Sequence, residues 1–207
     1  MAVLPMFPLG NVLFPYAVLP LSVFEPRYRM MVRRCIDGTG EFGVVLIERG
    51  SEVGGGDVRF DVGTVARIIQ ASEMPDGRFA VVTTGVRRFR VTAWLPDDPY
   101  PQAETELLDE IAPAAGAAEA RERAVDELRA VLDLWRRLEP RVPDELPPFS
   151  DDPPRAAYEL AAVAPIGPLD AQRVLETPAP HDQLALLTKL FAERADELRA
   201  RIAFGSE

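Results

Sequence analysis

The sequence is poor in the residue types that carry much of enzyme chemistry. Its 207 residues include one histidine, His181, one cysteine, Cys35, and a single lysine, Lys189. One cysteine cannot close a disulfide within the chain or build a cysteine-based zinc site. The phosphate loop of a P-loop NTPase needs a lysine directly after a glycine, whereas Lys189 follows Thr188. We therefore expect no cofactor and no metal site.

Positive charge is also scarce. The 33 acidic residues exceed the 23 lysines and arginines, which gives a formal net charge of −10. A chain with this balance does not attract phosphate backbones or anionic lipid surfaces over a broad area, so nucleic acid and membrane are not expected partners. The densest basic cluster, Arg87, Arg88 and Arg90, could bind an anion together with Arg67, although pairing with nearby carboxylates is the favoured interpretation.

Long uninterrupted apolar segments are missing as well. Residues 1–24 carry no charged side chain, but Pro5, Pro8, Pro15 and Pro20 interrupt them. Because proline removes a backbone donor and clashes inside a helix, this segment predicts short strands and turns rather than a signal peptide or a membrane span. Without an export signal or a disulfide, we expect a cytoplasmic protein.

Hydrophobic periodicity divides the chain into a strand-rich and a helical half. In residues 1–110, apolar runs separated by glycine and aspartate turns predict a small bent sheet or pseudo-barrel of mostly antiparallel strands. One helix interrupts the strands, because Tyr28, Met31, Val32 and Cys35 recur at helical spacing. The predicted strands cover residues 2–7, 17–22, 42–47, 61–71, 79–94 and 103–108.

Residues 117–207 predict helices. Asp152 before Pro153 is a typical helix start, with an N-cap acceptor followed by proline where its missing N–H costs nothing. The predicted helices cover residues 120–138, 153–165, 169–175 and 180–202, and we expect them to pack as a bundle. The fold class is therefore α+β, with a strand-rich domain over residues 1–110 and a helical bundle over residues 117–207.

Several segments look chemical but have a structural interpretation. Residues 38–43 match G-x-G-x-x-G, yet they follow a helix and open a strand, which reverses the context of a dinucleotide site. The glycines at 54–56 lack the helix start that a phosphate cradle needs and predict a flexible loop. The pairs at 97–98 and 151–152 adjoin prolines and favour turn and capping roles.

A catalytic site is not expected. A hydrolase would need His181, a serine such as Ser150 and an acid to converge in one pocket. A surface histidine at a helix start is the favoured interpretation of His181. We therefore predict a non-catalytic protein.

Short motifs in both halves occur in an order that is similar to one protein family. They are Phe7-Pro8-Leu9, Leu13-Phe14-Pro15, Leu19-Pro20-Leu21, Phe24-Glu25-Pro26-Arg27-Tyr28, Val62-Gly63-Thr64-Val65-Ala66, Pro75-Asp76-Gly77, Gly85-Val86-Arg87-Arg88-Phe89 and Ala171-Gln172-Arg173-Val174-Leu175-Glu176. Together they resemble the N-terminal substrate-binding domain of Lon, the ATP-dependent protease, over nearly the whole chain. The resemblance implies a PUA-like pseudo-barrel for the first half.

The resemblance also implies a function. In Lon the ATPase and proteolytic modules follow this domain, whereas this sequence ends at Glu207, directly after the last predicted helix. We therefore expect a stand-alone Lon N-terminal-like protein that binds polypeptide in protein quality control and has no protease chemistry. Its expected partners are unfolded or exposed apolar polypeptide segments, and a protease or another protein could act with it.

An apolar groove would recognise such segments by shape and hydrophobic contact. The candidate peptide-binding residues are aromatic, although a core position is the favoured interpretation for most of them. They are Phe14, Tyr16, Phe24, Tyr28, Trp94 and Tyr100. Two alternatives stay open: PUA-like folds include RNA readers, and the apolar face of residues 120–138 could dock on a partner as in an adaptor protein. The sequence leaves the oligomeric state open.

Overall fold

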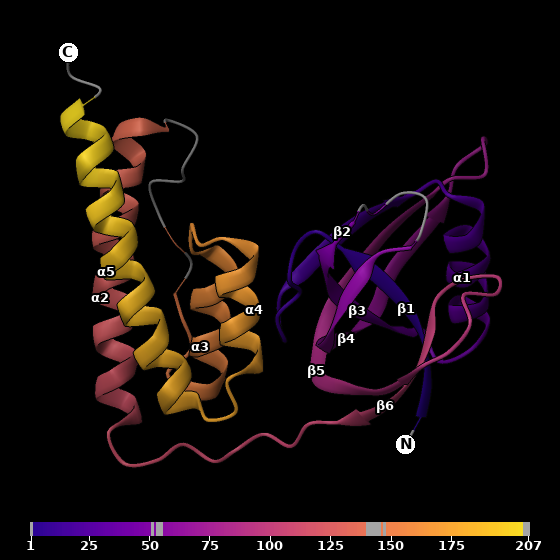
Figure 1. Cartoon of the computed structure of the whole chain (residues 1–207), viewed down its shortest axis with the longest axis horizontal. Coiled ribbons are helices and arrows are strands. Elements are labelled where there is room, and N and C mark those ends of the chain that lie inside the picture. Colours follow the sequence, from indigo (N-terminus) through magenta and orange to yellow (C-terminus); the bar gives the residue numbers. More distant parts are fainter. Residues whose placement is uncertain (1, 51, 53–55, 140–145, 147, 205–207) are drawn as a thin grey trace. The chain divides into compact units, whose positions relative to one another are not determined.

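The computed structural model describes residues 2–50, 52, 56–139, 146 and 148–204 (Figure 1). Its contacts divide the chain into two compact units, Met1–Asp109 and Glu110–Glu207. One sequence expectation, the flexible loop at glycines 54–56, lies outside the described residues at positions 54 and 55. In the described part of the chain, no helix has both the length and the apolar character that crossing a bilayer requires.

The first unit is built on one mixed sheet with the strand order β2-β5-β4-β3-β1-β6. Because β5 also pairs with β6, five of the strands form a ring, and β2 is attached to the first half of β5. The β1–β3 pairing is parallel and the other pairings are antiparallel. The strands are β1 (Ala2–Leu9), β2 (Val18–Val23), β3 (Glu41–Arg49), β4 (Val58–Glu73), β5 (Phe79–Trp94) and β6 (Gln102–Leu107).

The long hairpin of β4 and β5 shapes this ring. Its turn is the predicted one: Gly77 has a φ of 79°, and the Arg78 amide donates to Asp76 Oδ1 over 3.1 Å. The β4–β5 register shifts between Val65 and Ala66 and again between Ile68 and Gln70. Such bulges bend a strand and increase its twist, which lets the sheet curve far enough to close.

The third glycine of the G-x-G-x-x-G segment has a packing role. The segment follows helix α1 (Pro26–Asp37) and opens β3, in the order expected from the sequence. A Cβ atom on Gly43 would lie 2.5 Å from Met6 Sδ and 2.8 Å from Phe89 Cζ. A side chain at this position would force Met6 and Phe89 to move, because β1 and β5 side chains cross β3 at contact distance.

Buried side chains on both sides of the sheet form the core of this unit. The apolar face of α1 is buried as predicted and contributes Tyr28, Met31, Val32 and Cys35. The Tyr28 ring stacks on Phe7 with the centroids 4.3 Å apart. A smaller cluster contains Met6, Val45, Val65, Phe89, Val91 and Ala103.

The second unit contains four helices within its described residues: α2 (Ala117–Leu138), α3 (Pro153–Val163), α4 (Pro168–Glu176) and α5 (Pro180–Phe204). The apolar face of α2 packs on α5 and α3, so it is used inside its own unit. The Asp152 side chain makes no capping bond, contrary to expectation; its amide donates to Ser150 Oγ instead. The α+β class, with a strand ring, one early helix and C-terminal helices, is confirmed.

Candidate functional site

Three neighbouring strands present an uncharged outer face. Residues 18–23 of β2, 79–86 of β5 and 68–72 of β4 contain no acidic or basic side chain, in a chain where 27% of residues are charged. Along β5, Phe79, Val81 and Thr83 are buried, so the alternation of a strand turns Ala80 and Val82 to the other side. This stretch therefore combines exposure with an absence of charge.

The strand register assembles these residues into rows. Pro20, Val82 and Gln70 lie side by side across the three strands, and Ser22, Ala80 and Ser72 form the next row. They line a shallow hollow of about 360 Å³. Ile69, at the β4 bulge beside it, is 57% exposed. We call residues 18, 20, 22, 69, 70, 72, 80 and 82 the outer face.

Two exposed aromatic residues flank β2. Tyr16 and Phe24 are 50% and 54% exposed, and Val18 at the start of β2 is 63% exposed. Tyr16 has a φ of 67°, a left-handed conformation that is unfavourable for a bulky residue, and its amide donates to the Gly85 carbonyl over 2.8 Å. Strained residues of this kind concentrate at functional sites, which makes Tyr16 a candidate for recognition.

The free edge of β2 is poorly suited to strand addition. The Ala17 carbonyl accepts from the Gly85 amide over 2.9 Å, so strand alternation directs the backbone groups of Val18, Pro20 and Ser22 away from β5. Pro20 has no N–H to offer at the centre of that edge. Side chains, rather than main-chain pairing, are the recognition chemistry that this region offers.

The predicted aromatic residues do not form one surface. Phe14, Tyr28 and Tyr100 are buried in the core, so they offer no contact area to a partner. Burial raises the pKa of Tyr28 to about 12. Trp94 is half-buried and donates its indole N–H to Asp61 Oδ1 over 3.2 Å. The sequence shows aromatic residues at these positions but not which of them the folded chain covers.

The predicted anion-binding arginines are also divided. Arg67 makes two hydrogen bonds to Glu41 Oε1, of 2.7 and 3.0 Å, and Arg87 lies 3.7 Å from Glu41 Oε2. Arg88 is 1% exposed and therefore buried. Glu41 thus offsets much of the charge of the two surface arginines, and no broad cationic patch arises from this trio.

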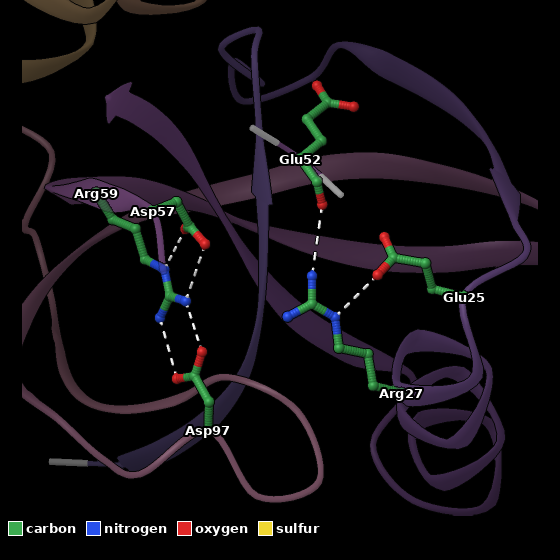
Figure 2. A network of polar contacts seen from close by, with 6 residues as sticks. All are labelled: Glu25, Arg27, Glu52, Asp57, Arg59 and Asp97. Carbon is green, nitrogen blue, oxygen red and sulfur yellow. Dashed lines mark hydrogen bonds and ion pairs between the residues drawn. The ribbon is translucent and has the colours of Figure 1, made fainter. Parts of the chain in front are cut away.

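A network of ion pairs fixes the chain segments next to β4 and α1 (Figure 2). Arg59 bonds Asp57 at 2.5 Å and Asp97 at 2.7 Å, and its guanidinium lies 4.8 Å from the centre of the Trp94 ring. Burial acts to raise the pKa of Asp57, but the hydrogen bonds that its carboxylate accepts and the positive charges of Arg59 and Arg27 together outweigh burial and lower that pKa. The Asp97 carboxylate, expected in a turn role, therefore joins a structural cluster.

A second polar cluster lies at the start of α1. Arg27 bonds Glu25 at 3.1 Å and donates to the Glu52 carbonyl over 3.5 Å (Figure 2). The Glu52 carboxylate in turn accepts from the Gly10 amide over 2.5 Å. Among the described residues, no group of three or more His, Cys, Asp or Glu side chains is placed to hold a metal ion.

Ser150 and His181, two described residues that a hydrolase would need, are not joined by a hydrogen bond. Ser150 Oγ accepts from the Asp152 amide, while the Ser150 amide donates to Glu159 over 2.7 Å. His181 lies at the start of α5, and its Nδ1 atom has no hydrogen-bond partner within the described part of the chain.

Residues 3–193 match the family described as the ATP-dependent protease La (LON) substrate-binding domain. The chain belongs to this family. A crystal structure of a Lon N-terminal domain protein from Xanthomonas campestris has the same fold, with a TM-score of 0.65 and 27% identity over 90% of this chain and 97% of that one. The N-terminal domain of a Mycobacterium avium complex Lon protease, 18% identical, superimposes with a TM-score of 0.63 over 92% of this chain and 98% of that one.

Curated relatives are much longer than the matched region. A Lon protease of Desulfovibrio desulfuricans is 33% identical over 189 residues, which cover 89% of this chain and 21% of that protein. A Lon protease of Escherichia coli K12 is 29% identical over 200 residues, covering 95% of this chain and 25% of that protein. The chain therefore spans about a quarter or less of these relatives, and it corresponds to their substrate-binding domain alone.

Sequence reasoning missed several residues of the outer face, among them Val18, Ile69 and Val82. A partial signal was present, because three stretches without charge stand in a chain rich in charge. Their alignment on one face depends on the β2–β5–β4 register and on the bulge at Ile69.

Proposed function

We propose that this Lon-family domain binds polypeptide segments with exposed apolar side chains, and that the outer face together with Tyr16 and Phe24 forms the binding surface. The observation that carries the proposal is the uncharged, exposed stretch across β2, β5 and β4 in a domain of a substrate-binding family. Of the predicted aromatic residues, Tyr16 and Phe24 are retained because they are exposed.

Binding would rest on hydrophobic contact. Covering one large apolar side chain contributes about 1.5–3 kcal/mol, so contacts to a few side chains suffice for a transient complex. A shallow hollow with few polar groups does not demand one sequence, which suits segments that become exposed when many different proteins unfold. No bond-making step is needed, and we propose a non-catalytic role in protein quality control, in which a separate protease receives the bound chain.

The two alternative functions gain less support. An RNA-binding surface would need clustered, unpaired arginines, but Arg88 is buried and Arg67 and Arg87 both face Glu41. An adaptor function through residues 120–138 would need a free apolar face, and that face packs on α5 and α3.

The proposal is tested with a carboxymethylated, permanently unfolded model protein as the ligand. We expect Ile69→Glu to weaken binding about tenfold or more, because it places a charge on the outer face. Val58→Glu is the matched control. It also replaces an exposed β-branched residue of β4 with glutamate, but Val58, which is 42% exposed, lies outside the outer face. Titration calorimetry of the full chain and both variants gives the affinities.

Two results would contradict the proposal. One is that the unmodified chain fails to bind the unfolded protein, just as it fails to bind the native form of that protein. The other is that Ile69→Glu and Val58→Glu weaken binding equally. Circular dichroism melts of both variants check that each folds as the unmodified chain does.

A further inference from the structure

A second and larger hollow lies at one end of the strand ring. It has a volume of about 560 Å³, within the range of small-molecule sites. Its apolar wall comes from the start of β1, the middle of β4 and the end of β6, and includes Val3, Leu4, Val65 and Leu107. Exposed Val3 and Leu107 lie on this wall, so apolar surface continues from the interior to the rim. The outer face described above shares none of these residues.

Two arginines stand beside this apolar wall. Arg34, in the last turn of α1, is exposed and has no hydrogen-bond or ion-pair partner within the described residues. Arg87 reaches Glu41 Oε2 only at 3.7 Å, whereas Arg67 bonds Glu41 Oε1 at 2.7 and 3.0 Å. Both guanidinium groups therefore keep donors that are free to bind an anion.

The lining also contains two acidic residues, Glu41 and Glu106. Glu41 is held by Arg67, and the remaining acid, Glu106, lies directly opposite Arg90 in the β5–β6 register. The hydroxyls of Thr39 and Thr105 add two more polar groups to the lining. The hollow thus places guanidinium donors beside apolar side chains, although the chain as a whole has a net charge of −10.

We propose that this hollow binds the C-terminal carboxylate of a polypeptide whose last side chains are apolar. At a chain terminus, the carboxylate and an apolar side chain are attached to the same Cα atom, which matches guanidinium groups placed beside an apolar wall. An internal Asp or Glu carries its carboxylate on the side chain itself and leaves the apolar wall unfilled. Arginine binds carboxylates through charge-assisted, often bidentate hydrogen bonds. The inference rests on the proposed polypeptide-binding function and names a substrate class for it.

The test compares two labelled peptides that end in the same apolar residues, one with a free C-terminal acid and one with a C-terminal amide. By fluorescence anisotropy with the full chain, we expect the acid to bind about tenfold more tightly than the amide. Arg87→Gln and Arg34→Gln should each remove most of this preference. Arg78→Gln is the control, since Arg78 is a similarly exposed arginine that pairs with Asp76 in the β4–β5 turn.

Each outcome has a distinct meaning. Equal affinities for acid and amide, both weakened by Ile69→Glu, would overturn the carboxylate inference and leave the proposed function intact. Binding of neither peptide would overturn both. Decanoate supplies the same apolar carboxylate without a peptide; if it displaces the acid peptide more effectively than the unlabelled peptide does, the hollow is a fatty-acid site and the proposal is wrong. An acid preference that Arg87→Gln abolishes and Arg78→Gln preserves supports it.

Discussion

Tyr16 combines an unfavourable backbone conformation with an exposed side chain, which the proposed binding role would explain. Its backbone is left-handed although its side chain is bulky, and half of the residue's surface is exposed. For a non-glycine residue, this conformation costs roughly 1–2 kcal/mol. The exposed ring recovers little of that cost by burial. We interpret the conformation as a means of holding an aromatic side chain at the end of β2.

This interpretation predicts opposite effects on stability and binding. Tyr16→Asn should raise the free energy of unfolding by about 1 kcal/mol, because asparagine tolerates the left-handed region, and should weaken binding of the unfolded model protein. Phe24→Asn is the matched control, an exposed aromatic residue without a positive φ, and should weaken binding without raising stability. Urea unfolding and calorimetry measure both quantities. A Tyr16→Asn variant that is less stable but binds normally would contradict this role.

At the scale of elements, the Arg59 cluster joins segments that are distant in sequence. Asp57 precedes β4, Asp97 follows β5, and Arg59 lies between them with its charge over the Trp94 ring. The cluster therefore fastens the start of one long strand to the loop after the other. Buried ion pairs of this kind stabilise mainly in the sense that removing one partner leaves the other charge unpaired.

Replacing Asp57 should produce a stability loss that depends on pH. The pKa of Asp57 is lowered in the folded chain, so its contribution is present above the unfolded pKa of about 3.9 and disappears as the pH falls through the folded value. We expect Asp57→Asn to lower the free energy of unfolding by about 1–3 kcal/mol at pH 7 and by progressively less below pH 4. Urea titrations at several pH values measure the difference.

An exposed pair provides the control for this prediction. Asp126 bonds Arg129 on the surface of α2, and Asp126→Asn should change the free energy of unfolding by less than about 0.5 kcal/mol. If Asp57→Asn and Asp126→Asn behave alike, the Arg59 cluster does not stabilise the first unit.

Local patterns predict elements well, and pairing between distant elements poorly. The helical spacing of Tyr28, Met31 and Val32 was enough to predict α1 and its buried face, because helix periodicity is a local property. Closure of the ring requires the second half of β5 to pair with β6, while its first half pairs with β2, and no local signal specifies either pairing. The same limit explains why Phe24 is exposed while Tyr28, four residues on, is buried.

The candidate site follows the same rule. The basic run at 87–90 is a candidate anion-binding cluster for which the sequence favours pairing with carboxylates. Strand alternation and a bulge bury Arg88 and leave Arg87 at the mouth of a hollow. Arg34 joins Arg87 through folding of α1 against the ring, which the sequence order does not reveal. The sequence shows that arginines are present at positions 34 and 87, but it does not show that folding brings them to the same hollow.

At the scale of the whole molecule, charge and apolar surface are unevenly distributed. The first unit has 11 arginines against 14 acidic residues, whereas the second has 12 basic residues against 19 acidic ones. Both candidate sites lie in the first, less acidic unit. The buried faces of α2 and α5 are occupied by packing within the second unit. These features support our proposal that the first unit, rather than the helical one, binds polypeptide.

Methyl NMR of the full chain, titrated with the carboxymethylated unfolded protein, tests this assignment most directly. We expect the methyl resonances of Val18, Ile69, Ala80 and Val82 to shift together as the complex forms, while those of the buried leucines of α2 and α5 stay in place. Shifts confined to the helical unit, with the outer face unchanged, would contradict the account.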